Sequence, residues 1–308
     1  MIKKSATLLL KGIAMGAADV VPGVSGGTIA FITGIYEELL ATIAGINLTT
    51  FKTLKTDGVK GFWKAINGNF LLPLICGIAI SIVSLAHAVT YALENHPLLV
   101  WGFFFGLVVA STIVVGKTIK KWNFKLFVSL ILGAAFAFWI TTLNPGEGSS
   151  QSWYIFVSGV LAICAMILPG ISGAFILLLL GSYNTILTAI KSLDVTTAAI
   201  FAIGCVTGLL SISKLLSWAF KHYHNLMISV LTGFLIGSLN KLWPWKNTIS
   251  TRVNSHGEIV PFIQQNVSPL DFEILVNNNQ LLGVISMAIG GVVLVLGLEF
   301  LGARWNKK

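Results

Sequence analysis

Apolar residues run along this chain in long blocks separated by short polar stretches. Six of these blocks are uninterrupted and approach the roughly 20 residues that an α-helix needs to cross the hydrocarbon core of a bilayer. They cover residues 70–94, 98–116, 124–143, 196–220, 224–242 and 280–301. The pattern therefore predicts six transmembrane helices.

Two further apolar segments, residues 5–43 and 153–190, are each broken near the middle. The first break reads PGVSGG and contains Pro22 and Gly23, and the second reads PGISGA and contains Pro169 and Gly170. Proline removes an amide donor and glycine frees the backbone, so a helix should stop there and a new one should start behind a serine N-cap. Each segment is therefore predicted to form a broken, re-entrant hairpin.

The two broken segments are copies of one another. Residues 21–43 align with residues 168–190 without a gap, and the identical positions include both prolines, the first glycine of each motif, Ser25/Ser172 and Tyr36/Tyr183. The sequences GFFFG at 102–106 and GFLIG at 233–237 repeat as well, and both predict close helix packing. We expect two repeats, residues 1–143 and 144–308, each a hairpin followed by three helices.

The distribution of lysine and arginine predicts the orientation of these repeats, since basic loops stay in the cytoplasm. Basic residues gather at 3–4, 52–64, 117–125, 221 and 304–308. All of these can be cytoplasmic only if the first hairpin enters and leaves from the inside. The second hairpin and the polar loop 243–279 then belong outside, so the repeats are inverted and both termini are cytoplasmic.

Composition places the chain in the all-α integral membrane class. Hydrophobic residues make up 55% of its 308 residues and charged residues only 10%. The net charge of +9 is explained by the basic loops, so nucleic acid is not an expected partner. The three cysteines lie in apolar runs without metal-ligand spacing, and no cofactor or hydrolase motif is present, so we expect no metal, no cofactor and no enzyme.

The breaks themselves are the candidate binding site. Half-helices that start at Ser25 and Ser172 would direct free amides and the positive ends of their dipoles into the protein, which favours an anion and above all a phosphate. Gly26, Gly27 and Gly173 would let the backbone approach it. The alternative is that the prolines and glycines serve only as kinks or packing points.

Two polar residues beside the first break have no polar counterpart in the second. Thr28 aligns with Phe175 and could donate to a ligand, or bond to its own helical turn. Asp19 aligns with Met166 and could couple transport to protonation, because a carboxylate near a phosphate favours a proton on one of them. Asp19 could equally cap the half-helix after the break.

Weaker candidates lie away from the motifs. His87 and Lys214 align between the repeats and could guide an anionic headgroup, although a satisfied histidine and a lysine that reaches the interface are the simpler interpretations. Tyr36 and Tyr183 are the aromatic pair that the repeat preserves.

The stretches GAADVVPGVSGGTIAFITGIYEELL and LPGISGAFILLLLGSYNTIL give the chain a family resemblance. It resembles the polyprenyl-phosphate transporter (PopT) family of bacteria, formerly a family of unknown function, over nearly its whole length. The resemblance implies a multi-pass protein of the bacterial cytoplasmic membrane that moves undecaprenyl phosphate from the outer to the inner leaflet and so recycles the lipid carrier of cell-wall synthesis. It implies Ser25, Gly26, Gly27, Thr28, Ser172 and Gly173 as headgroup-binding residues.

The residues alone leave three functions open: a lipid-phosphate flippase, a transporter or channel for a small soluble anion, and a membrane-bound lipid-phosphate enzyme. A proton or a sodium ion is a candidate coupling ion, and the oligomeric state stays open.

Overall fold

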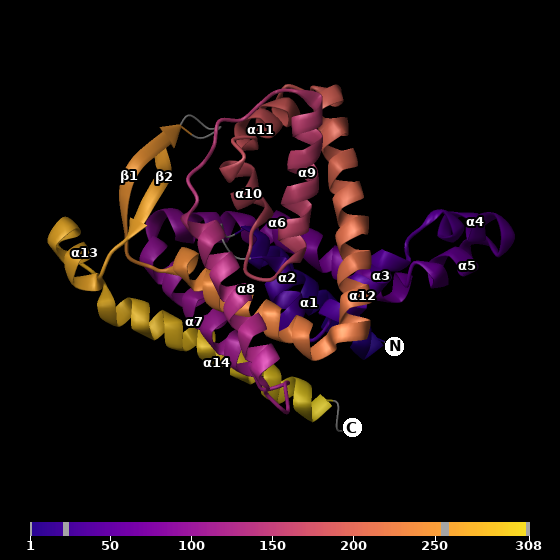
Figure 1. Ribbon diagram of the computed structural model, residues 1–308, viewed down its shortest axis with the longest axis horizontal. Helices are drawn as coiled ribbons and strands as arrows, with labels where there is room; N and C mark the ends of the chain where they lie inside the picture. The colour runs from indigo at the N-terminus through magenta and orange to yellow at the C-terminus, as the bar shows by residue number, and fades with distance from the viewer. Residues whose placement is uncertain (1, 21–24, 254–258, 306–308) are drawn as a thin grey trace.

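The computed structural model describes residues 2–20, 25–253 and 259–305, and helices account for most of them (Figure 1). The first part of the chain forms α1 (Ile2–Val20), α2 (Gly26–Ile32), α3 (Tyr36–Gly45), α4 (Leu48–Thr56), α5 (Gly58–Ala65), α6 (Gly68–Asn95), α7 (Pro97–Gly116) and α8 (Phe124–Thr142). The second part forms α9 (Ser152–Ile167), α10 (Gly173–Leu179), α11 (Tyr183–Lys191), α12 (Val195–Leu242), β1 (Lys246–Val253), β2 (Ile259–Asn266), α13 (Pro269–Val276) and α14 (Leu281–Trp305).

Four of the described helices, α6, α7, α8 and α12, are long and apolar enough to cross a membrane, and the number rises to 6 if each of two bent helix pairs counts as one span. The chain is therefore a multi-pass membrane protein. The predicted helices at 196–220 and 224–242 both lie within α12, which runs for 48 residues. Tyr223 between them has non-helical backbone angles, and α12 turns sharply along its length in Figure 1.

Long helices pack in pairs, and the pairs correspond between the two parts of the chain. Helix α1 packs along α6 as α9 packs along the first part of α12, and α7 packs along α14 as α8 packs along α12. The two glycine motifs mediate the last two contacts. A Cβ at Gly106 would lie 2.0 Å from the carbonyl oxygen of Ala288, and one at Gly237 would lie 2.3 Å from that of Ala134. The prediction that these motifs are packing faces is confirmed.

Each broken segment contains a second break that the sequence analysis did not predict. Helices α2 and α3 meet at 117°, and α10 and α11 meet at 110°. Gly34 and Gly181, which align in the repeat, lie at these corners with φ of 71° and 65°. Other residues rarely adopt such angles, so glycine allows the chain to turn there. The expectation of one break per segment was wrong, because Gly34 and Gly181 have no proline beside them to mark a second stop.

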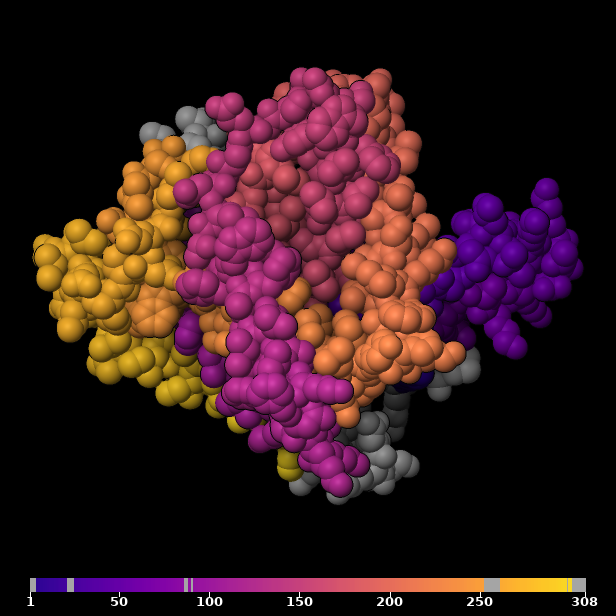
Figure 2. All heavy atoms as spheres, viewed as in Figure 1, coloured from indigo at the N-terminus to yellow at the C-terminus, as the bar shows by residue number. Residues whose placement is uncertain are grey.

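Two polar regions stand apart from the long helices. Strands β1 and β2 pair antiparallel within the loop 243–279, from Lys246 opposite Asn266 to Val253 opposite Ile259, and they add a small sheet to the expected all-α class. The strands were not predicted, because neither KNTISTRV nor IVPFIQQN alternates regularly between apolar and polar residues. The short helices α4 and α5 form a lobe that projects from the body of the protein (Figure 2).

Candidate functional site

The first break leads directly into the start of α2. Pro22 and Gly23 lie outside the described residues, and Ser25 follows as the N-cap of α2 with extended backbone angles. The Ser25 hydroxyl accepts a hydrogen bond from the Gly27 amide at 3.0 Å and donates one to the carbonyl oxygen of Met166 at 2.6 Å. Because Ser25 is only 1% exposed, both bonds are shielded from bulk water. A half-helix therefore restarts at the serine, as the sequence predicted.

Asp19, at the end of α1, supplies the second cap of this half-helix. Its Oδ1 accepts a hydrogen bond from the Gly26 amide at 2.7 Å. A helix N-terminus attracts anions because its first amides lack partners within the helix. In this structure the protein's own carboxylate occupies that position. The capping role that the sequence left as an alternative is thus present, and a role in coupling stays a prediction.

The second break packs directly against the first. Thr28 is fully buried, and its Oγ1 accepts a hydrogen bond from the Gly170 amide at 2.9 Å. A Cβ at Gly27 would lie 2.5 Å from the carbonyl oxygen of Ile167. These contacts join positions about 140 apart in the sequence, so the structure brings the two motifs together. Among the described residues Thr28 makes no side-chain bond to its own turn, and its role toward a ligand stays a prediction.

The start of α10 is chemically different from the start of α2. Ser172 is the N-cap residue by position and is 6% exposed, but its side chain makes no capping hydrogen bond. Gly170, which follows Pro169, has φ of 86°, and Gly173 opens the helix. The expectation that Ser172 caps its half-helix as Ser25 does was therefore wrong, because its hydroxyl does not reach the first amides.

The weaker candidates belong to elements other than the half-helices α2 and α10. Tyr36 is 2% exposed, packs edge-on against Phe31 and Phe220, and its hydroxyl has no hydrogen-bond partner among the described residues. Tyr183 opens α11, and Lys214 is exposed on α12. His87 belongs to α6, but its side chain lies outside what the structure describes.

An apolar cavity of about 170 Å³ lies beside α2, between α1, α7 and α14. Its wall includes Ala14 and Ala18 of α1, Ile29 of α2, Phe104 of α7 and Val295 of α14. Small side chains on α1 leave the space that the larger residues of the other helices do not fill. Sequence analysis missed this cavity, because Val295 is far from the breaks along the chain.

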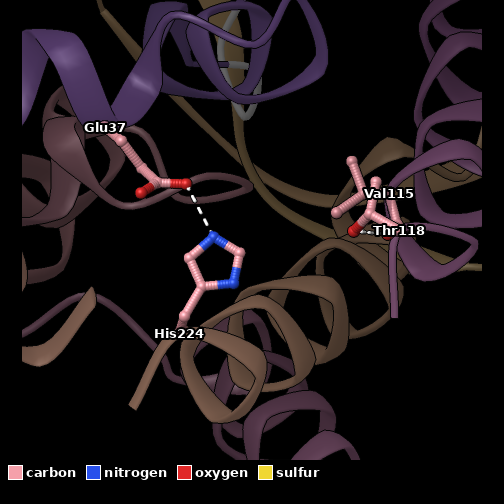
Figure 3. Close-up of polar contacts among 4 residues, drawn as sticks. All are labelled: Glu37, Val115, Thr118 and His224. Atoms are coloured by element: carbon pink, nitrogen blue, oxygen red, sulfur yellow. Dashed lines mark hydrogen bonds and ion pairs between the residues drawn. The ribbon is translucent and has the colours of Figure 1, made fainter. Parts of the chain in front are cut away.

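A polar contact joins α3 to the bend in α12. The Nε2 atom of His224 lies 3.0 Å from a carboxylate oxygen of Glu37 at the start of α3 (Figure 3). The two side chains are 51% and 55% exposed, so the contact contributes little stability. The same view shows the Thr118 hydroxyl donating to the carbonyl oxygen of Val115, a local bond just past the end of α7. Across residues 2–20, 25–253 and 259–305, no group of three acidic, histidine or cysteine side chains could hold a metal ion.

Comparison with known proteins gives this arrangement a family. A polyprenyl-phosphate transporter of Vibrio cholerae is 49% identical over 291 residues, which cover 94% of each chain. A polyprenyl-phosphate transporter of Staphylococcus aureus is 33% identical over 259 residues, which cover 77% of this chain and 85% of that protein. No solved structure matches significantly. The family model described as undecaprenyl phosphate translocase-like matches residues 15–260, and the chain belongs to this family.

Proposed function

We propose that this protein transports polyprenyl phosphate across the membrane and binds its phosphate at the paired helix breaks. The observation that carries the proposal is the position of Asp19. Its carboxylate accepts a hydrogen bond from the first amide of α2, close to the contact between the two motifs. An amide that holds a carboxylate oxygen at 2.7 Å suits a phosphate oxygen equally well. The names of the two relatives support the same substrate class.

The proposed site is Ser25, Gly26, Gly27 and Thr28 from the first motif, with Ser172 and Gly173 from the second. Pro22, Gly23, Pro169 and Gly170 serve to break the helices. The apolar cavity beside α2 is suited to part of the lipid chain, since apolar walls exclude water and favour hydrocarbon.

Asp19 has the role of a competitor in this proposal. A headgroup that takes the Gly26 amide must displace the carboxylate, and two anions at one helix end repel each other. Protonation of either one relieves the repulsion, so proton uptake would accompany headgroup binding. Asp19 is thereby a proposed coupling residue, with the proton as the coupling ion.

The proposed arrangement in the membrane is an inverted repeat of residues 1–143 and 144–308. The bent pairs α2–α3 and α10–α11 and the matching helix pairs support it, as do the basic loops. Both termini would then be cytoplasmic in a bacterial inner membrane, and transport would run from the outer to the inner leaflet for reuse of the lipid in cell-wall synthesis.

Transport is tested by reconstitution of the purified protein into liposomes with undecaprenyl phosphate. A phosphatase added outside removes phosphate only from lipid in the outer leaflet, so the fraction cleaved over time reports transbilayer movement. The expected result is complete cleavage within minutes with protein, and about half without it. Equal kinetics with and without protein would refute the proposed function, and release of phosphate without added phosphatase would indicate an enzyme.

The arrangement is tested separately by cysteine labelling. Single cysteines at Ser149 and Lys60, in a background without the three native cysteines, should react with an impermeant maleimide from opposite sides of the membrane. Labelling of both from one side would contradict the inverted repeat.

A further inference from the structure

A second cavity, of about 420 Å³, is lined by polar and apolar residues together, and none of those described comes from the PGVSGG or PGISGA motif. Its walls come from the last residues of α8 and the segment that follows, from α10, from the end of α12 and from the β1–β2 hairpin. Sequence reasoning assigned the loop 243–279 no role, yet this loop forms much of the wall.

Two lysines, Lys241 and Lys246, are among the residues that line this cavity. Lys246, the first residue of β1, donates to the carbonyl oxygen of Lys241 at 2.7 Å and lies 3.9 Å from the ring centroid of Trp101. Lys241, in the last turn of α12, lies 4.5 Å from the ring centroid of Phe175 on α10. Aromatic faces hold both cations in place, but an aromatic ring does not neutralise a charge.

In the part of the chain that the structure describes, no acidic side chain forms an ion pair with either lysine. Among the described residues that line the cavity, none is aspartate or glutamate. Burial, and in second place the charge of Lys241, lowers the pKa of Lys246 to about 7. Several uncharged side chains of the wall hydrogen-bond to one another: Asn240 donates to Thr141, and Asn266 donates to Asn240. Two partly buried cations without a counter-charge are costly for the folded protein and are the expected feature of a site that receives an anion.

A helix-capping hydrogen bond explains only one of the two lysines. Lys246 donates to a carbonyl oxygen in the last turn of α12. Lys241 lies in that turn, where the helix dipole favours a cation, but among the described residues it makes no such bond and holds its ammonium over Phe175. A second lysine beside the first repels it and so weakens a helix cap, whereas two neighbouring lysines attract an anion more strongly than one.

We propose that this cavity is a second anion site, which binds a phosphate monoester between Lys241 and Lys246. The inference rests on the proposed function in one respect: the phosphate would be the headgroup of the transported lipid, held before or after its passage. Phe175 and Leu178 of the cavity wall belong to α10, so a headgroup here lies beside the half-helix of the second motif. A free phosphate ion shares the chemistry, and the experiment separates the two sources.

Binding at this site should weaken as the pH rises. Only the charged form of Lys246 attracts the ligand, and Lys241 is the one other ionisable side chain of the described cavity wall. A phosphate monoester has its second pKa near 6, so above pH 7 its own charge is nearly constant. From pH 7 to 8.5 the affinity should therefore fall with the charge of Lys246.

The test is calorimetric titration of the full chain in detergent with three probes: farnesyl phosphate, inorganic phosphate and farnesol. Lys241→Gln and Lys246→Gln should each weaken farnesyl phosphate binding about tenfold or more, as expected for the loss of one charged hydrogen bond. Lys125→Gln is the matched control, because Lys125 is exposed in the first turn of α8, at the end opposite to Thr141 and Thr142 of the cavity. It should bind as the parent does, and farnesol should not bind through the lysines.

Lys241→Arg and Lys246→Arg complete the set, because they keep the charge and should retain binding within a few-fold. Thermal unfolding shows whether each variant is folded. If a glutamine variant is unfolded, the arginine variant at the same position is used for the test. Unchanged binding in both glutamine variants would overturn this site while the transport assay still stands. Lysine-dependent binding of inorganic phosphate without farnesyl phosphate would overturn the lipid assignment and keep the anion site. A parent protein that binds neither phosphate refutes the site altogether.

Discussion

The two helix breaks share a motif but differ in what satisfies their half-helices. At the first break, Asp19 and the Ser25 hydroxyl hold the amides of Gly26 and Gly27. At the second, Met166 stands at the position of Asp19, and Ser172 makes no capping bond. The start of α2 is thus closed by a carboxylate, while the start of α10 is left without a side-chain cap.

The difference extends to the neighbourhood of each break. Thr28 at the first break accepts a hydrogen bond from Gly170, whereas its counterpart Phe175 packs against the ammonium group of Lys241. The apolar cavity adjoins α2, and the cavity that contains Lys241 and Lys246 adjoins α10. A duplicated backbone has therefore received two kinds of chemistry, with negative charge near one break and positive charge near the other.

The largest expected effect comes from giving the first break the residue of the second. Gly27→Ala adds a Cβ that would lie 2.5 Å from the carbonyl oxygen of Ile167, so the two motifs must move apart. We expect a loss of about 1–3 kcal/mol in the free energy of unfolding. Its counterpart Ala174 is exposed, so the reciprocal Ala174→Gly should cost only about 0.5–1 kcal/mol. Thermal unfolding in detergent measures both, and equal losses would contradict the interlocked geometry.

Asp19→Asn is the next in size and tests the proposed competitor. The asparagine Oδ1 can still accept from Gly26, so the fold should persist, but the charge that changes with pH is gone. We expect liposome transport to lose its pH dependence and to slow about tenfold, which corresponds to about 1.4 kcal/mol. Met166→Leu is the control at the matching position and should leave the pH profile unchanged. A variant that follows pH as the parent does would leave Asp19 as a capping residue only.

Serine-to-alanine changes compare the two N-caps directly. Ser25→Ala removes bonds to Gly27 and Met166 and should cost about 1 kcal/mol of stability. Ser172→Ala removes no capping bond and should change stability by less than about 0.5 kcal/mol. Chemical unfolding of the two variants side by side decides the matter, and a greater loss at Ser172 would show that the second break is capped in another way. If both serines also touch the phosphate, both variants should weaken its binding.

The last prediction concerns how the stability of the cavity around Lys241 and Lys246 depends on pH. The pKa of Lys246 is about 7 in the folded protein against an ordinary value of 10.5, so between these pH values the unfolded chain binds more protons. The stability that this residue contributes should therefore rise with pH from 7 to 10.5, and below pH 7 the full cost of the buried charge remains. The melting temperature of Lys246→Gln should rise less over this range than that of Lys125→Gln. Parallel curves would show that Lys246 is not buried in solution.

The sequence by itself determined the membrane class, the positions of the broken segments and the family. Each of these follows from local facts: apolar blocks of spanning length, proline and glycine beside a serine, and a motif that occurs twice. The sequence also predicted that a half-helix begins at Ser25, because an N-cap depends on residues within one turn.

Only the tertiary structure decided which groups meet. The bond between Ser25 and Met166 and the bond between Gly170 and Thr28 join positions 141 and 142 residues apart, and no periodicity encodes such distances. The corner at Gly34 was hidden because a lone glycine is also compatible with a helix, and its positive φ is seen only in the structure. The pairing of Lys241 with Lys246 was equally hidden, since a polar loop gives no sign of what it encloses. Caps and helix breaks depend on neighbouring residues and can be predicted from the sequence. A site between distant segments forms only when packing brings their backbones into contact.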